Sequence, residues 1–192
     1  MLMRTDINHL LGRIWMVVFL LWFVTAIRSK RTTQSHEPIA SRAAVWIVWL
    51  GWLLMFGHGM NIPWLQQRFA PMTDTAAYAG FAIALAGMGL AVWARFLIGQ
   101  NWSALIELKA DHQLIRTGPY SIVRHPIYSG FMLATLGTAI AYGEVSGLVG
   151  FILVLGAWGY KAQLEERVLR EHFGAEYERY QQEVKGLIPF VW

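Results

Sequence analysis

The sequence predicts an all-α, multi-pass membrane protein, and three observations support this prediction. Of the 192 residues, 56% are hydrophobic and only 15% are charged, whereas soluble domains carry about 25% charged residues. The mean hydropathy is +0.39. The apolar residues also gather in long blocks, which is typical of chains that fold in lipid. No linker, repeat or low-complexity tract divides the chain, so we expect residues 1–192 to form a single domain.

Five apolar blocks have, or approach, the length of about 17–25 residues that a helix needs to cross a bilayer. In order, they are Leu10–Ile27, Ala43–Met60, Thr75–Ile98, Ile127–Tyr142 and Ser146–Ala162. The first lacks a small-residue cleavage site and runs into Arg28-Ser29-Lys30-Arg31, so we expect it to be retained. The last two are separated only by Gly143-Glu144-Val145, which predicts a tight antiparallel hairpin.

The basic residues predict the orientation, because cytosolic loops are enriched in Lys and Arg. With the amino terminus outside, every Lys and Arg except Arg4, Arg13 and Arg68 falls on the cytosolic side. The polar loop 99–126 and the carboxyl-terminal segment are then cytosolic. The membrane would be the inner membrane of a bacterium or the endoplasmic reticulum of a eukaryote. This bias also explains the formal net charge of +4, so we infer no nucleic-acid partner.

The carboxyl-terminal segment predicts an amphipathic helix after the fifth block. Apolar side chains recur there at helical spacing, at Leu164, Val168, Phe173, Tyr177, Tyr180 and Val184. Such a helix would lie on the membrane surface or fold back over the polar loop.

Several classes of site are excluded. The chain has no cysteine, so it has no disulfide, thiolate metal site or cysteine nucleophile. It contains no phosphate-binding loop or dinucleotide fingerprint, and no pair of its six histidines has metal-ligand spacing. Gly57-His58-Gly59 and Gly87-Met88-Gly89 lie in apolar blocks, where small residues favour close helix packing.

Residues 116–128 are the strongest candidate for a ligand site. They crowd polar and aromatic side chains around two prolines, at Arg116, Tyr120, Arg124, His125 and Tyr128. Gly118-Pro119 forces a turn, and Pro126 suits an early position of the fourth helix. Irregular backbone at membrane depth is tolerated only where protein buries it or where it lines a cavity. We therefore favour a pocket over a plain turn whose Arg and His meet lipid headgroups.

The fifth block adds a second candidate. Lys161 and Glu165 are four residues apart and share a helix face near the membrane boundary, where ionisable groups are costly to bury. An ordinary ion pair with a snorkelling lysine has the same spacing. If the pair faces the loop, Glu165 could hold an ammonium group and Lys161 an anionic substrate.

The order of several short motifs indicates a family. They are His112-Gln113-Leu114-Ile115, Gly118-Pro119-Tyr120, Arg124-His125-Pro126-Ile127-Tyr128-Ser129-Gly130, Glu165-Glu166 and Phe173-Gly174-x-x-Tyr177-x-x-Tyr180. This succession resembles the isoprenylcysteine carboxyl methyltransferases and their microbial relatives, integral-membrane enzymes that use S-adenosylmethionine. The resemblance covers about residues 99–190, which we therefore expect to bind the cofactor.

The resemblance implies roles for individual residues. The side chains that would surround the cofactor are His112, Gln113, Leu114, Ile115, Tyr120, His125, Pro126, Ile127 and Tyr128. Glu165 would bind the amino-acid end of the cofactor. The arginine that the family places near the substrate carboxylate falls at Lys161, which keeps the charge but loses the two-pronged guanidinium.

The best single hypothesis is methyl transfer to the carboxylate of an isoprenylcysteine-like lipid, whose tail enters from the bilayer. This reaction needs no metal and no discrete general base. An amine or thiol acceptor, as in phospholipid or small-lipophile methylation, would need a proton acceptor such as Glu107, His112 or His125. A sterol-type NADPH reductase is disfavoured by the small number of spans. A scaffold or transporter is disfavoured because the first three blocks offer few polar residues to line a path.

Overall fold

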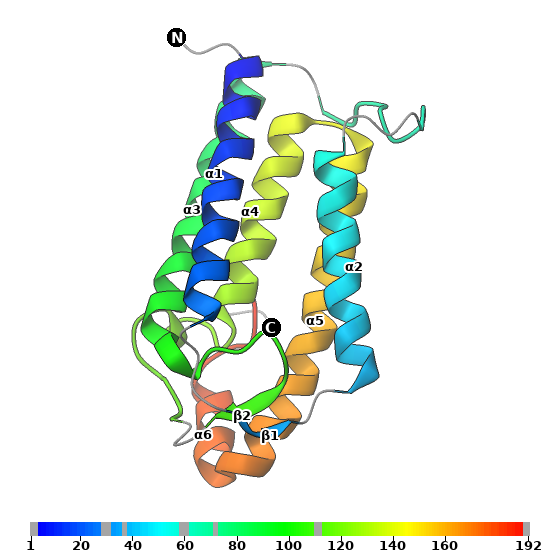
Figure 1. The fold of residues 1–192 in the computed structure, drawn as a ribbon. Coiled ribbons are helices and arrows are strands. Elements are labelled where there is room, and N and C mark those ends of the chain that lie inside the picture. Colours follow the sequence, from blue (N-terminus) through cyan, green and yellow to red (C-terminus); the bar gives the residue numbers. More distant parts are fainter. Residues whose placement is uncertain are drawn as a thin grey trace.

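The computed structural model describes residues 4–27, 32–35, 38–57, 62–70, 73–109 and 113–189. Long helices lie side by side and a small ribbon and a short helix gather at one end (Figure 1). The elements are α1 (Arg4–Ala26), β1 (Thr32–Ser35), α2 (Ile39–Phe56), α3 (Asp74–Ile98), the 3₁₀ turn η1 (Gly99–Asn101), β2 (Glu107–Lys109), the 3₁₀ turn η2 (Gly118–Ser121), α4 (Pro126–Tyr142), α5 (Val145–Phe173) and α6 (Ala175–Glu183). The all-α prediction is confirmed, and the antiparallel pair β1–β2 is a small addition to it.

Four of the described helices are long and apolar enough to cross a membrane. These segments are Asp6–Ala26, Ile39–Phe56, Asp74–Asn101 and Val145–Phe173. α4 has 17 residues and is not one of these four segments. It packs against α3 and α5 in the interior of the bundle. The predicted number of five spans therefore stays a prediction, while the multi-pass membrane architecture is clear.

The α3–α4 interface is built from small residues. A Cβ atom on Gly80 or Gly87 of α3 would lie closer than 3.0 Å to backbone atoms of α4, and the same holds for Gly137 of α4 against α3. The two backbones therefore touch, as small residues allow in membrane helices. The predicted packing role of Gly87 is confirmed, whereas Gly89 faces open space. The other predicted glycine motif is Gly57-His58-Gly59. Gly57 ends α2, and residues 58–59 lie outside the described part of the chain.

Aromatic side chains fill the space between the helices. Trp15 of α1 donates a hydrogen bond to Thr138 (2.9 Å), and Trp52 of α2 donates one to Thr135 (3.2 Å). Phe131 of α4 packs between these tryptophans and Trp158 of α5. Since buried indole N–H groups need acceptors, the two threonines fix how α1 and α2 sit against α4.

The carboxyl-terminal part differs from the prediction in its boundaries. The fifth helix does not end at Ala162 but continues to Phe173. Gly174 then adopts a positive φ of 53°, which favours glycine, and α6 turns back along α5. Tyr177 and Tyr180 are buried, so α6 folds back over the polar loop rather than lying on the membrane surface.

Candidate active site

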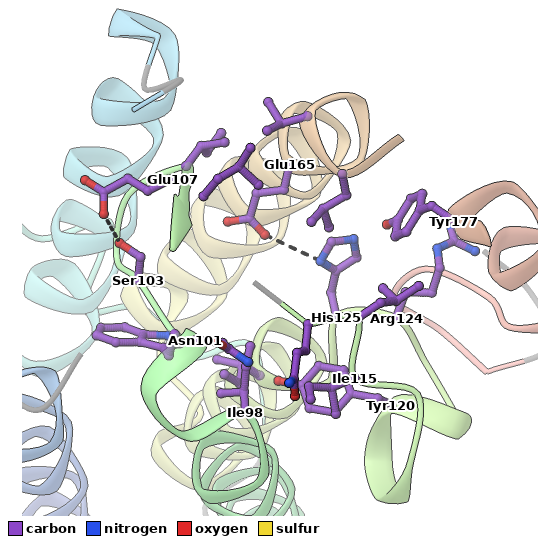
Figure 2. Close-up of a pocket in the computed structure, with 18 of the residues that line it drawn as sticks. Ile98, Asn101, Ser103, Glu107, Ile115, Tyr120, Arg124, His125, Glu165 and Tyr177 are labelled. Carbon is purple, nitrogen blue, oxygen red and sulfur yellow. Dashed lines mark hydrogen bonds and ion pairs between the residues drawn. The ribbon is translucent and has the colours of Figure 1, made fainter. Parts of the chain in front are cut away.

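A pocket lies at the end of the bundle where α4 begins and where α5 meets α6 (Figure 2). Its walls come from the η1–β2 segment, the loop before α4, the start of α4, α5 and α6. The predicted cofactor residues that line it are Gln113, Leu114, Ile115, Tyr120, His125, Pro126, Ile127, Tyr128 and Glu165. His112 lies outside the described residues. Side chains more than 50 residues apart in the sequence thus share one hollow.

Backbone contacts with residues 185–187 shape the loop before α4. The N–H groups of Arg124 and His125 donate to the carbonyls of Lys185 (2.8 Å) and Gly186 (3.0 Å). Ser129 donates from its hydroxyl to the carbonyl of Leu187 (2.6 Å). Pro126 has no N–H and begins α4. Residues 185–187 therefore hold His125, which precedes Pro126, in a non-helical conformation at the start of the helix.

Tyr120 forms the floor of the loop. Its ring is buried and its hydroxyl donates to the carbonyl of Ala94 (3.4 Å). Its own carbonyl accepts a hydrogen bond from the hydroxyl of Tyr180 (2.5 Å). Arg116 pairs with Glu183 and lies over the ring of Tyr180 (5.3 Å), so Arg116 fastens the loop to α6 and does not line the pocket.

His125 is buried between two carboxylates of α5. Its Nδ1 lies 3.6 Å from Glu165 and its Nε2 lies 3.1 Å from Glu166. Burial lowers the pKa of the imidazole, but the hydrogen bonds and charges of Glu165 and Glu166 outweigh burial, so the pKa is raised above its usual 6.5. The ring also stacks on Tyr128 at 5.7 Å, and Tyr128 stacks on Trp158 at 5.5 Å. The carboxylates on its two nitrogens and the stacked Tyr128 ring thus fix the orientation of the imidazole.

The two neighbouring carboxylates have different environments. Glu166 accepts hydrogen bonds from Arg124 (2.6 and 2.9 Å) and from Gln181 of α6 (2.9 Å). Glu165 instead lines the pocket, where it accepts a hydrogen bond from the Tyr128 hydroxyl. Glu166 therefore joins the loop before α4, α5 and α6, while Glu165 presents its carboxylate to the pocket.

Lys161 lies deeper in the bundle than the sequence suggested. Its side chain is buried, and its Nζ donates to the Ser41 hydroxyl of α2 (2.9 Å). It lies 4.0 Å from Glu165 and is absent from the pocket wall. Lys161 is thus connected to the pocket through Glu165, and its predicted contact with the substrate stays a prediction.

Asn101 and Tyr177 in the pocket wall were not among the predicted site residues. The side-chain oxygens of Asn101 and Tyr177 are buried and have no hydrogen-bond partner within the described part of the chain. On the wall beside β2, Ser103 donates to Glu107 (2.8 Å). Asn101 belongs to no motif, whereas Tyr177 belonged to the amphipathic stripe and to the last of the family motifs but was given no ligand contact. Unpartnered buried oxygens suit a ligand that carries polar groups.

No group of three His, Asp or Glu side chains that could hold a metal ion occurs among the described residues. The pocket instead combines the carboxylates of Glu107 and Glu165 with aromatic rings and aliphatic walls. This composition fits a cationic organic ligand with an apolar part, because few polar groups in a largely apolar pocket fix the orientation of such ligands.

Comparisons with known proteins agree with this description. The family model for phospholipid methyltransferases matches residues 75–176. A probable protein-S-isoprenylcysteine O-methyltransferase of Oryza sativa subsp. indica is 33% identical over 171 residues, which cover 86% of each chain. The corresponding enzyme of Saccharomyces cerevisiae is 34% identical over 124 residues, which cover 62% of this chain and 51% of that protein.

A solved structure also matches. The eukaryotic intramembrane Ras methyltransferase, an isoprenylcysteine carboxyl methyltransferase, superposes with a TM-score of 0.55 at 28% sequence identity. The match covers 83% of this chain and 55% of that one, so the chain spans little more than half the length of the solved relative. The family model, the rice relative and the shared fold together show that this chain belongs to the isoprenylcysteine carboxyl methyltransferase family of membrane enzymes.

Proposed function

We propose that this enzyme transfers a methyl group from S-adenosylmethionine to the carboxylate of an isoprenylcysteine-like lipid. The observation that carries the proposal is the single pocket that brings Tyr120 and His125 of the loop together with Glu165 of α5. The acceptor is the one named for the relatives from rice and yeast. We further propose that the pocket opens to the cytosol, as the distribution of basic residues indicates.

The residues of the pocket fit the proposed methyl donor. When bound, S-adenosylmethionine supplies a methyl group that its sulfonium has already activated. Glu165 offers a carboxylate to the ammonium of the donor, and Tyr128 and His125 hold that carboxylate in place. Preorganised charge of this kind stabilises a reacting ligand more than mobile charge does. Ile115 and Tyr120 provide apolar surface for a nucleobase.

Positioning is the main contribution expected of the protein. Good orientation of two reactants can supply about 7–11 kcal/mol of the barrier. A carboxylate acceptor carries no proton that must leave, so no general base is required. The buried rings of Tyr177 and Tyr180 on α6 cover the donor end and exclude water, which strengthens the attraction between Glu165 and a cation.

Lys161 is proposed to attract the acceptor carboxylate from inside the bundle. Its only described hydrogen bond is to a neutral hydroxyl, that of Ser41, and its nearest carboxylate, Glu165, is 4.0 Å away. The carboxylate of an acceptor that binds beside Lys161 would therefore give its ammonium a closer ion-pair partner. The lipid tail of such an acceptor would lie between the helices, in the bilayer.

Methylation of a phospholipid amine is the second candidate, favoured by the family model that matches residues 75–176. An amine acceptor must release a proton, and Glu107 in the pocket wall could accept it. The carboxylate of Glu107, however, is already engaged by a hydrogen bond from Ser103. This detail favours the carboxylate acceptor.

The test is a panel of acceptors offered to the detergent-purified protein with radiolabelled S-adenosylmethionine. We expect a prenylated cysteine to be methylated, and phosphatidylethanolamine and a small thiol to be methylated far less. Lys161→Met should lower turnover of the prenylated cysteine more than it lowers donor binding, with Lys161→Arg as the control that keeps the charge. Saturable binding of a reduced nicotinamide in place of S-adenosylmethionine would overturn the proposal.

A further inference from the structure

One buried tyrosine of the pocket carries a hydroxyl that its packing does not require. Tyr177 of α6 is only 1% exposed, yet its hydroxyl has no hydrogen-bond partner among the described residues. A buried hydroxyl without a partner is costly, and a phenylalanine would fill the same space without that cost. The position therefore carries a hydroxyl that neither packing nor the protein's own hydrogen bonds explain.

Tyr180, one turn further along α6, provides the comparison. The two rings contact each other edge to face, with centroids 5.9 Å apart, and Tyr180 is buried to a similar degree. The hydroxyl of Tyr180, however, donates to the carbonyl of Tyr120 at 2.5 Å. The docking of α6 onto the loop thus accounts for one tyrosine hydroxyl and leaves the other unexplained.

The Tyr177 hydroxyl faces the charged end of the pocket. Tyr177 lines the pocket, and Figure 2 shows its oxygen on the side of the ring that faces His125 and Glu165. Burial, and then the charge of Glu166, raise the pKa of Tyr177 above its usual value. The hydroxyl therefore keeps its proton at physiological pH and can donate a hydrogen bond.

The other donors at this end are already engaged. Arg124 donates to Glu166 and to the carbonyls of Gln181 and Val184. His125 contacts both carboxylates of α5 with its two ring nitrogens. A ligand carboxylate that enters beside Glu165 must find a donor, because an anion there is otherwise repelled. The Tyr177 hydroxyl, in contrast, has no partner among the described residues and can donate to such a ligand.

We infer that the Tyr177 hydroxyl donates a hydrogen bond to the α-carboxylate of the methyl donor, next to the site where Glu165 holds its ammonium. The ammonium and the carboxylate are attached to the same carbon atom, so their protein partners must be neighbours. A neutral donor suits this place because Arg124 and His125 already face the two carboxylates of α5 there. The inference rests on the proposed use of S-adenosylmethionine and adds a residue that selects for its intact amino-acid end.

The experiment compares Tyr177→Phe with the wild type and with the matched control Tyr180→Phe. Equilibrium binding of S-adenosylmethionine, S-adenosylhomocysteine and decarboxylated S-adenosylmethionine is measured by calorimetry, and thermal unfolding is followed without ligand. Tyr177→Phe should weaken binding of the first two ligands about tenfold or more, as expected for a lost hydrogen bond to a charged group. It should leave binding of the decarboxylated ligand unchanged and should not lower the unfolding temperature, because the buried hydroxyl has no partner to lose among the described residues.

Tyr180→Phe should instead lower the unfolding temperature, because it removes the hydrogen bond to Tyr120. Any change that it causes in affinity should be the same for S-adenosylmethionine and for its decarboxylated form. Equal affinity of Tyr177→Phe and the wild type for S-adenosylmethionine would overturn the inference. An equal loss for all three ligands would also overturn it, because the hydroxyl would then contact another part of the ligand.

The wild type alone provides a second test, which holds even if Tyr177→Phe fails to fold. Tighter binding of S-adenosylmethionine than of its decarboxylated form supports the inference, and equal binding of the two overturns it. Failure of the wild type to bind any of the three ligands would instead refute the proposed function, so the two failures are distinguishable.

Discussion

The two sides of α4 serve different purposes. Toward α3, the helix presents Gly137 and Ala134 and lies in backbone contact with its neighbour. At its first turn, toward α5, it presents Tyr128 beside His125 and the carboxylate of Glu165. The first side contains no ionisable group, and the second concentrates charge and aromatic rings. A tightly packed face can thus hold a helix in place while the end of that helix carries the chemistry, as preorganised sites require.

The largest effect on stability is expected from a substitution on the side of α4 that packs against α3. Gly87→Ala would bring a Cβ atom closer than 3.0 Å to the backbone of Gly130 and Ala134. Backbone atoms cannot rotate away, so we expect the free energy of unfolding to fall by about 3 kcal/mol or more. Thermal unfolding in detergent measures the change. The matched control is Gly89→Ala, two residues away and facing open space. Equal losses in the two variants would refute the idea that backbone contact fixes α4.

The second effect concerns the charged side. Glu165→Gln removes the carboxylate that faces the pocket while it keeps the shape of the side chain. We expect donor affinity to fall about 100-fold, which corresponds to about 2.7 kcal/mol. Equilibrium binding of S-adenosylmethionine measures the change. A variant that binds normally would contradict the assignment of Glu165 to the ammonium of the donor.

The third effect separates the two neighbouring carboxylates. Glu166→Gln breaks the ion pair with Arg124, a pair that is mostly buried and joins the loop to α5. We expect the free energy of unfolding to fall by about 2 kcal/mol, with a smaller loss of donor affinity than in Glu165→Gln. Chemical denaturation and binding assays on the two variants check this. If Glu166→Gln reduced donor affinity more than it reduced stability, the division of roles between the two residues would be wrong.

The smallest expected effect is a dependence of the stability of the folded protein on pH. The pKa of His125 is raised above 6.5 in the folded protein, because the two carboxylates outweigh burial. Its stabilising contribution is therefore complete below pH 6.5 and is lost as the pH rises through the raised value. The unfolding temperature of the wild type should fall over this range, and that of His125→Gln should fall less. Parallel profiles would show that other groups dominate the titration.

Much of the fold could be predicted because the bilayer leaves few alternatives. A chain in lipid must satisfy its backbone hydrogen bonds internally, so long apolar blocks become helices. Pro126 was predicted to lie early in the fourth helix, and α4 begins at that residue. Tyr120, His125 and Glu165 were predicted to share a site, and they line one pocket. Local motifs and helix periodicity were sufficient for these features.

Other features depend on contacts that periodicity does not encode. The continuation of α5 beyond Ala162 was missed, because the amphipathic stripe fits one helix as well as two helices broken at Gly174. The burial of Lys161 depends on Ser41, 120 residues away in the sequence. The Tyr177 hydroxyl was missed because an aromatic position in a stripe predicts packing and says nothing about its polar atom.

The backbone bonds from Lys185 and Gly186 to the start of α4 also bear on the synthesis of the enzyme. These residues leave the ribosome after every helix of the bundle, so the donor end of the pocket is completed only when translation has passed them. Chains interrupted earlier can insert all their apolar helices and still lack a formed catalytic cavity. Assembly of the active centre therefore depends on a segment that is synthesised after the helices it joins.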